Sequence, residues 1–251
     1  MIDSHRHGPH IHLALARAPV NALDPTLCNA LVDALARAVN DGAHGIVLSG
    51  GARVFSAGLD VPYLMGLGDD ASALRAGWES FFAAARALAE CPVPVVAAIE
   101  GHAPAGGCVL ALCCDHRIMA DAPIRIGLNE TQVGLAVPES VQHLLRRTVG
   151  RRVAERMLLV GAMIEPREAL AIHMIDALVP PGETVAAALE WLAALEALPR
   201  APMLTTRAMG RADLVRALSP EHLDIDQPLR DWLHPDTQQG LRALLAKLGK
   251  S

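Results

Sequence analysis

Residues 92–121 read "PVPVVAAIEGHAPAGGCVLALCCDHRIMAD". Within this stretch, the apolar run 93–99 predicts a buried strand, residues 108–114 predict a short helix, and residues 116–121 predict a second strand. Two adjacent glycines, Gly106 and Gly107, lie where the first strand gives way to the helix. Glycine loses much conformational entropy on folding and contributes no side chain, so this pair indicates a place where bare backbone is needed.

The same alternation of strands and helices extends over the first two-thirds of the chain. "LDPTLCNALVDALARAVNDG" (23–42) predicts a helix capped by Asp24, with Pro25 in its first turn and Gly42 at its end. A second long helix is expected over residues 71–90. Further strands are expected over residues 11–16, 45–50 and 174–180. Strands separated by helices favour a layered α/β core with parallel strands.

Helical patterns dominate from residue 138 onward. The expected helices cover residues 139–149, 151–160, 167–172, 184–197 and 202–218. Since no Gly/Ser-rich linker interrupts the chain, we expect one compact α/β unit rather than two independent domains. Its core is expected over residues 1–195 and a helical C-terminal portion over residues 196–251.

The composition excludes several classes of function. The chain of 251 residues is 52% hydrophobic, which is ample for a large core, and carries a net charge of −5. Only 3% of the residues are aromatic, and the basic residues are scattered, so nucleic acid is not expected as the main partner. The longest apolar stretch, 93–114, is broken by Glu100, His102 and the paired glycines, so no membrane span is expected.

The cysteines and the N-terminal histidines each allow a metal-site interpretation. Five cysteines occur without any CxxC pair, which favours buried thiols in a reducing compartment over a metal or redox cluster. No Asp, Glu or Cys joins the four histidines of "HRHGPHIH" (5–12) in a fixed spacing, so we expect a solvated lead-in to the first strand instead of a metal site. The N-terminus has no long apolar run typical of a signal peptide, and cytoplasmic localisation is expected.

Two loops predict a backbone anion site. "FSAGLD" (55–60) leaves one strand toward a helix, and "PAGGC" (104–108) does the same one unit later. Small residues leave the backbone N–H groups unshielded, and two such turns side by side could hold a developing oxyanion. Glycine pairs at strand–helix junctions are also common for purely structural reasons. Neither a phosphate-binding GxxxxGK[ST] or GxGxxG motif nor a GxSxG nucleophile elbow is present.

A third segment, "RIGLNETQVGL" (125–135), places the polar pair Asn129 and Glu130 inside an apolar run. A carboxylate at such a point is exposed to solvent, caps a turn, or is buried for chemistry. If it is buried, the apolar neighbours should raise the pKa of Glu130 toward neutrality. Those neighbours are Ile126, Leu128, Val133 and Leu135.

Taken together, "VFSAGLD" (54–60), "PAGGCVLALCCDHRIMAD" (104–121) and "IGLNETQVGL" (126–135) resemble the crotonase (enoyl-CoA hydratase/isomerase) superfamily. Within it they are most similar to the Δ3,Δ2-enoyl-CoA isomerases of fatty-acid β-oxidation. The resemblance extends from about residue 10 to residue 200. It implies a ββα spiral core and an enzyme that acts on coenzyme A thioesters, without a metal or a redox cofactor. It also implies a homotrimer or a dimer of trimers, with residues 196–251 as the trimerisation region.

The resemblance also implies a role for each motif. The backbone N–H groups of Leu59 and Gly106 would form an oxyanion hole, and Glu130 would be the catalytic base with Asn129 beside it. The segment Ala57, Gly58, Leu59, Asp60 and Val61 would lie along the acyl-CoA. The family's hydratases carry a second glutamate where this chain has Val109, which cannot help to activate a water molecule.

These residues favour isomerisation. Glu130 would move a proton from C2 of a 3-enoyl-CoA to C4 while the thioester oxygen carries the negative charge, giving trans-2-enoyl-CoA. The alternatives are an enoyl-CoA hydratase or another crotonase-type acyl-CoA enzyme, and a protein that binds acyl-CoA without catalysis. Two departures from the family pattern concern the site: Ala105 replaces a glycine of the hydratases, and "DAPIRIG" (121–127) is one residue shorter than in the isomerases.

Overall fold

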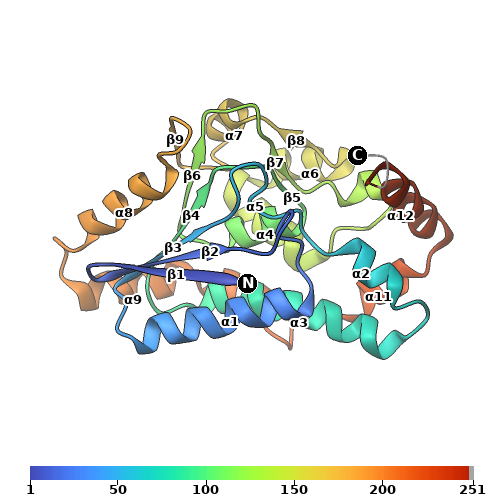
Figure 1. Ribbon diagram of the computed structural model, residues 1–251, viewed down its shortest axis with the longest axis horizontal. Helices are drawn as coiled ribbons and strands as arrows, with labels where there is room; N and C mark the ends of the chain where they lie inside the picture. Colours follow the sequence, from blue (N-terminus) through green and yellow to red (C-terminus); the bar gives the residue numbers. More distant parts are fainter. Residues whose placement is uncertain (249–251) are drawn as a thin grey trace.

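A six-stranded sheet forms the centre of the protein in the computed structural model, which describes residues 1–248. In spatial order its strands are β1 (Ile2–His7), β2 (His10–Leu15), β3 (Gly45–Ser49), β4 (Val95–Ile99), β6 (His116–Ala120) and β9 (Ala177–Val179). Strands β1 and β2 form an antiparallel hairpin, and all the other neighbours are parallel (Figure 1). The predicted α/β core with parallel strands is therefore confirmed.

A second, three-stranded sheet lies beyond the ends of β3 and β4. Its strands are β5 (Ala103–Pro104), β7 (Ile126–Gly127) and β8 (Met163–Ile164). Strand β7 is central, parallel to β5 and antiparallel to β8. This sheet therefore connects two segments that the sequence analysis singled out, the loop after β5 and the segment after β7.

Helices surround the two sheets. They are α1 (Pro25–Asn40), α2 (Val61–Gly66), α3 (Ala71–Glu90), α4 (Gly106–Leu112), the 3₁₀ helix η1 (Glu130–Val133), α5 (Glu139–Val149), α6 (Arg151–Val160), α7 (Pro166–Ala171), α8 (Thr184–Leu195), α9 (Arg200–Gly210), α10 (Ala212–Ala217), α11 (Asp226–Trp232) and α12 (Pro235–Leu248). None of the helices within residues 1–248 is long and apolar enough to cross a membrane.

The large sheet separates two hydrophobic clusters. The larger cluster includes alternate residues of β2 (Ile11, Leu13 and Leu15) and the buried faces of α1, α3 and α4. The smaller one lies on the other face, where α8 covers β3, β4 and β6 (Figure 1). Strand residues that are buried on both faces explain the continuous apolar runs of β3 and β4.

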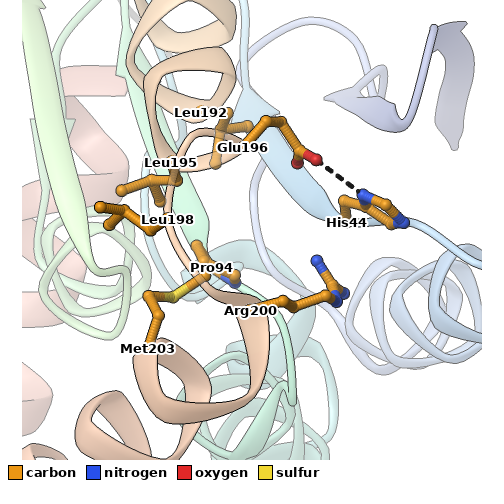
Figure 2. A pocket seen from close by; sticks show the side chains of 8 residues that line it. All are labelled: His44, Pro94, Leu192, Leu195, Glu196, Leu198, Arg200 and Met203. Carbon is orange, nitrogen blue, oxygen red and sulfur yellow. Dashed lines mark hydrogen bonds and ion pairs between the residues drawn. The ribbon is translucent and has the colours of Figure 1, made fainter.

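Helices α8 and α9 meet beside the start of β4 and leave a small cavity of about 40 Å³. Figure 2 shows its apolar side, formed by leucines of α8 and the following turn together with Pro94 and Met203. On the opposite side His44 Nδ1 lies 3.0 Å from a carboxylate oxygen of Glu196, next to Arg200. This cavity lies on the α8 side of the sheet, away from both glycine-bearing loops.

Several sequence predictions are confirmed closely. Asp24 caps α1 by accepting a hydrogen bond from the backbone N–H of Leu27 at 2.8 Å, Pro25 is the first helical residue, and Gly42 follows with φ of 76°. Helix α3 has the predicted bounds, because its apolar face is continuous and Asp70 caps its start.

The N-terminal segment is exposed, as expected, but it is not a simple lead-in to the first strand, because residues 2–7 themselves form β1. This strand pairs with β2 so that His5 faces His12 and His7 faces His10. Its side chains are almost all exposed. A polar edge strand buries no face, so it shows no hydrophobic alternation in the sequence.

The single helix expected over residues 202–218 is also wrong, because it is divided into α9 and α10 at Arg211. The Arg211 side chain is buried. Its guanidinium donates to the backbone oxygen of Cys113 at 2.6 Å and to Asp115 at 3.0 Å. Gly210, a poor helix former, precedes it, and the anchored arginine fixes the change of direction.

The helices of the C-terminal portion pack against the core of their own chain. Leu214, Leu218 and Leu241 are fully buried, and Trp232 is 2% exposed. All four belong to the main hydrophobic cluster. Of the predicted region 196–251, residues 249–251 lie outside the described part of the chain. That this region joins subunits into a trimer stays a prediction.

Candidate active site

The loop 55–60 is held by a short segment in front of α1. The backbone N–H of Leu23 donates to the Gly58 oxygen at 2.7 Å, and the N–H of Asp60 donates to the Leu23 oxygen at 3.0 Å. This is the pattern of a parallel bridge between Leu23 and Leu59. Because residues 58 and 60 turn their bonding groups toward Leu23, the N–H of Leu59 points to the opposite side. Within residues 1–248 it has no hydrogen-bond acceptor.

Polar side chains fix the two ends of this loop. The buried Ser56 hydroxyl donates to the Asn21 oxygen at 2.7 Å and accepts from the Gly58 N–H at 3.2 Å. At the other end, Asp60 caps α2 and lies 2.8 Å from the guanidinium of Arg17. The same arginine lies 3.1 Å from Asp24. The carboxylate of Asp60 thus holds the loop in position through these contacts.

The second loop begins at β5 and ends in α4. The N–H of Ala103 donates to the Arg125 oxygen, and the N–H of Ala105 donates to the Gly127 oxygen, both at 2.9 Å. Ala105 has φ of 45° and ψ of −119°, a conformation that favours glycine. Gly106 is the first residue of α4, so its N–H has no partner inside the helix, and none is found elsewhere in the described chain.

The two loops touch backbone to backbone. A Cβ atom on Gly58 would lie 2.8 Å from the Gly106 nitrogen, and one on Gly106 would lie 3.1 Å from the Gly58 Cα. A Cβ atom on Gly107 would lie only 2.3 Å from the Ser56 oxygen. Glycine is therefore required by close approach at Gly58 and Gly107, and at Gly58 also by φ of 81°, whereas a Cβ atom on Gly106 would force a small shift of its neighbours. The contact brings the free N–H groups of Leu59 and Gly106 to neighbouring positions.

Pairing of β5 with β7 places Glu130 beside this contact. Two residues separate the end of β7 from η1, whose first residue is Glu130. One carboxylate oxygen of Glu130 and the amide oxygen of Asn129 are buried without a hydrogen-bond partner in the described chain. The charge of Glu130 also helps to raise the pKa of Cys108, on the first turn of α4. The carboxyl group is therefore buried near the start of α4 and not turned to bulk solvent.

Burial raises the pKa of Glu130 to about 7, against an ordinary value of 4.5, and its own backbone N–H opposes the shift. The expectation of a near-neutral pKa is thus confirmed. No other carboxylate contributes to the shift, which distinguishes this group from a like-charged pair. Val109 is 1% exposed and part of the main apolar cluster.

Two later segments of the chain fix η1. The Thr131 hydroxyl donates to the Leu158 oxygen of α6 at 2.7 Å. From the other side α12 lies directly on η1, since a Cβ atom on Gly240 would be 2.4 Å from the Val133 oxygen. The hydroxyl of Thr237 also donates to the Gly134 oxygen. The packing of α12 on η1 could not be predicted from the sequence, because a helical pattern alone does not show which surface a helix covers.

Most of the residues singled out from the sequence thus lie together. Gly58, Leu59 and Gly106 meet where the loops touch, and Asn129 with Glu130 follows from the β5–β7 pairing. Ala57 donates its N–H to the Val20 oxygen at 3.0 Å, and Val61 begins α2. Sequence reasoning missed Arg17, Asn21 and Ser56, which act on the loop's position. Their roles become apparent only in the structure, where the Ser56 hydroxyl is buried against the Asn21 oxygen and the Arg17 guanidinium lies between Asp24 and Asp60.

The N-terminal histidines lie on the β1–β2 hairpin, and the cysteines are buried thiols. Within residues 1–248 no group of three His, Cys, Asp or Glu residues is arranged to hold a metal ion. The rings of His5 and His7 are 6.0 and 6.1 Å from that of His12 on the β1–β2 hairpin. All five cysteines are buried free thiols, as expected, and burial raises their pKa values.

Comparison with known proteins identifies the fold. The family model described as enoyl-CoA hydratase/isomerase matches residues 11–248. The crystal structure of human mitochondrial delta3-delta2-enoyl-CoA isomerase superposes with a TM-score of 0.93 at 31% identity, covering 99% of this chain and 98% of that one. The expected crotonase-like fold is therefore confirmed.

Curated relatives carry two kinds of name. Human mitochondrial enoyl-CoA delta isomerase 1 is 36% identical over 235 residues, 92% of this chain and 77% of that protein. A putative enoyl-CoA hydratase of Thermus thermophilus is 35% identical over 173 residues, 66% of this chain and 65% of that protein. Because the human relative is named as mitochondrial, the comparisons do not support the expected cytoplasmic localisation, which stays a prediction.

The contact at Gly107 gives a test of the loop geometry. Gly107→Ala should destabilise the protein by about 1–3 kcal/mol or more, because its Cβ would overlap the Ser56 oxygen. Gly66→Ala in α2 is the matched control, since a Cβ atom there meets nothing within 4 Å. Urea unfolding measures both. Equal stabilities of the two variants would contradict the close approach.

The buried carboxyl of Glu130 gives a test by pH. The folded protein keeps a proton that the unfolded chain releases between pH 4.5 and about 7, so its stability falls as the pH rises through that window. Glu130→Gln removes this loss. The variant should match the wild type at low pH and exceed it by on the order of 3 kcal/mol near pH ~8. A stability difference independent of pH would show that the carboxyl is not buried.

Proposed function

The chain belongs to the enoyl-CoA hydratase/isomerase family, and on this basis we propose that it is a Δ3,Δ2-enoyl-CoA isomerase. It would move the double bond of 3-enoyl-CoA thioesters into conjugation, giving trans-2-enoyl-CoA, as in fatty-acid β-oxidation. The observation that carries the proposal is a single buried carboxyl, that of Glu130, whose pKa burial raises to about 7. It lies close to two backbone N–H groups that have no acceptor within residues 1–248.

The N–H groups of Leu59 and Gly106 would receive the thioester oxygen. Removal of a proton from C2 places negative charge on that oxygen, and donors fixed beforehand stabilise it without reorganisation. Each donor of this kind contributes about 10²–10³ in rate. The segment from Ala57 to Val61 would lie along the acyl-CoA, with Asp60 anchoring it through Arg17.

Glu130 would serve as both base and acid. As carboxylate it takes the proton from C2, and as carboxylic acid it returns a proton to C4 of the dienolate. The net change is the position of the double bond, and the carboxylate is regenerated. A pKa near 7 suits both steps at neutral pH, since neither form is strongly favoured. Asn129, whose amide oxygen is buried next to it, would contact the substrate.

The apolar position 109 favours isomerisation over hydration. Hydration needs a water molecule held and activated beside the double bond. Val109 offers no polar atom, and no second carboxylate acts on Glu130. An apolar wall also helps to exclude water while the enolate exists. A coenzyme A thioester would be the only small-molecule partner needed, without a metal or redox cofactor, and a homotrimer or a dimer of trimers is the expected assembly.

Substitution of Glu130 tests the proton transfer. Glu130→Gln keeps the shape of the side chain but cannot take a proton, so kcat for a 3-enoyl-CoA should fall by at least about 10²–10⁴. Binding of a 2-enoyl-CoA product, measured by calorimetry, should survive. Near-normal turnover by the Gln variant would rule out Glu130 as the base.

The pH profile and a hydration assay separate the alternatives. For the wild type, kcat/KM should rise with pH and level off above about 7, because the carboxylate is the active form of the base. Water addition to a trans-2-enoyl-CoA should be slower than isomerisation by at least a hundredfold. Comparable hydration would instead identify a hydratase, and binding without either reaction would identify a non-catalytic acyl-CoA-binding protein.

A further inference from the structure

A polar cavity of about 310 Å³ lies at the opposite end of α4 from the candidate active site. Cys114 and Asp115, just after α4, form one wall, and Arg117 of β6 continues it. The end of α5, the turn after α7 and Arg211 complete the lining. Since α4 separates this cavity from Gly106 by its whole length, the cavity is not part of the acyl-CoA site.

Arginines dominate the charge of this cavity. Arg117 lies 2.7 Å from Asp176, and Arg211 lies 3.0 Å from Asp115. Arg147 is paired with Asp213 at 3.1 Å, outside the lining. Arg207 shares Asp115 with Arg211, at 2.8 Å. These three separate groups of ion pairs together hold four guanidinium groups against three carboxylates.

The excess positive charge is largely buried. The side chains of Arg117 and Arg211 are only 11% and 8% exposed. The Nε atoms of both are buried, and neither has a hydrogen-bond partner in the described chain. Each of these guanidinium groups has a carboxylate partner, but Arg207 and Arg211 share Asp115, so one positive charge is left in excess. An anion in the cavity would balance that excess.

His173 adds an independent observation. It lies in the turn after α7 with φ of 61°, a conformation that favours glycine, and its side chain lines the cavity. Its backbone N–H donates to the Leu170 oxygen at 3.0 Å, and its ring has no hydrogen-bond partner within residues 1–248. His173 is exposed, so its ring is accessible to an anion in the cavity.

We propose that this cavity binds a phosphate group, either inorganic phosphate or the phosphate of a small organic ester. Arg147, through its remaining Nη1 atom, and His173 would donate hydrogen bonds to the phosphate oxygens. The buried guanidinium groups of Arg117 and Arg211 would add positive charge to the wall of the cavity. A water molecule occupies about 30 Å³ in the liquid, so the cavity has room for a phosphate group and several further atoms.

Binding is tested with the full-length protein and two probes, inorganic phosphate and adenosine monophosphate. Phosphate should raise the Tm in a saturable way, whereas chloride at equal ionic strength should not. Calorimetry then gives the Kd for each probe. Tighter binding of the ester than of phosphate would identify an organic phosphate as the ligand, and the reverse would identify free phosphate. An equal rise of Tm with chloride would overturn the proposal.

Variants locate the site. Arg147→Gln should weaken phosphate binding at least tenfold, and the matched control Arg151→Gln, an exposed arginine on α6, should change it less than twofold. His173→Gly should keep the fold, since glycine suits φ of 61°, and should weaken binding severalfold. Equal affinity in Arg147→Gln and Arg151→Gln, or unchanged affinity in His173→Gly, would contradict the assignment. Isomerase activity should persist in all three variants.

Discussion

The rest of the candidate site depends on the contact between two backbones at Gly58, Gly106 and Gly107. A Cβ atom on Gly58 or Gly107 would fall 2.8 or 2.3 Å from an atom of the facing loop, and one on Gly106 would make an unusually tight contact at 3.1 Å. Each loop is held independently, one by Leu23, Ser56 and Asp60, and the other by the pairing of β5 with β7. Two free N–H groups therefore face the site from rigid supports, as a site for a developing oxyanion requires.

At Glu130, burial of the carboxyl group affects both the stability of the protein and the proton affinity of the group. Its carboxyl is placed where water is scarce, and burial raises its pKa to about 7. The protein is less stable at neutral pH for that reason, since the unfolded chain would ionise freely. The same burial leaves the carboxyl able to take up or release a proton near neutrality. The walls responsible are apolar residues around η1, together with α12 packed upon it.

Local patterns predicted the elements whose causes are local. The cap at Asp24, the continuous apolar face of α3 and the apolar runs of β3 and β4 are each readable in a short window. The paired glycines likewise indicated bare backbone, and the segment around Glu130 stood out as a polar pair in an apolar run, although its burial could not be decided. The roles expected for Glu130, Leu59 and Gly106 were inferred from the resemblance to the family. What could not be predicted depends on distant partners: the polar strand β1, the ladder of only two residues between β5 and β7, and the position of α12 on η1.

The packing of α12 on η1 has a consequence for how the candidate site is completed. Parts of the candidate site are drawn from Arg17 near one end of the chain and from Gly240 near the other. The cover of η1 is therefore complete only when α12 has docked on it. The surroundings of Glu130 thus depend on a helix that lies far from it along the chain.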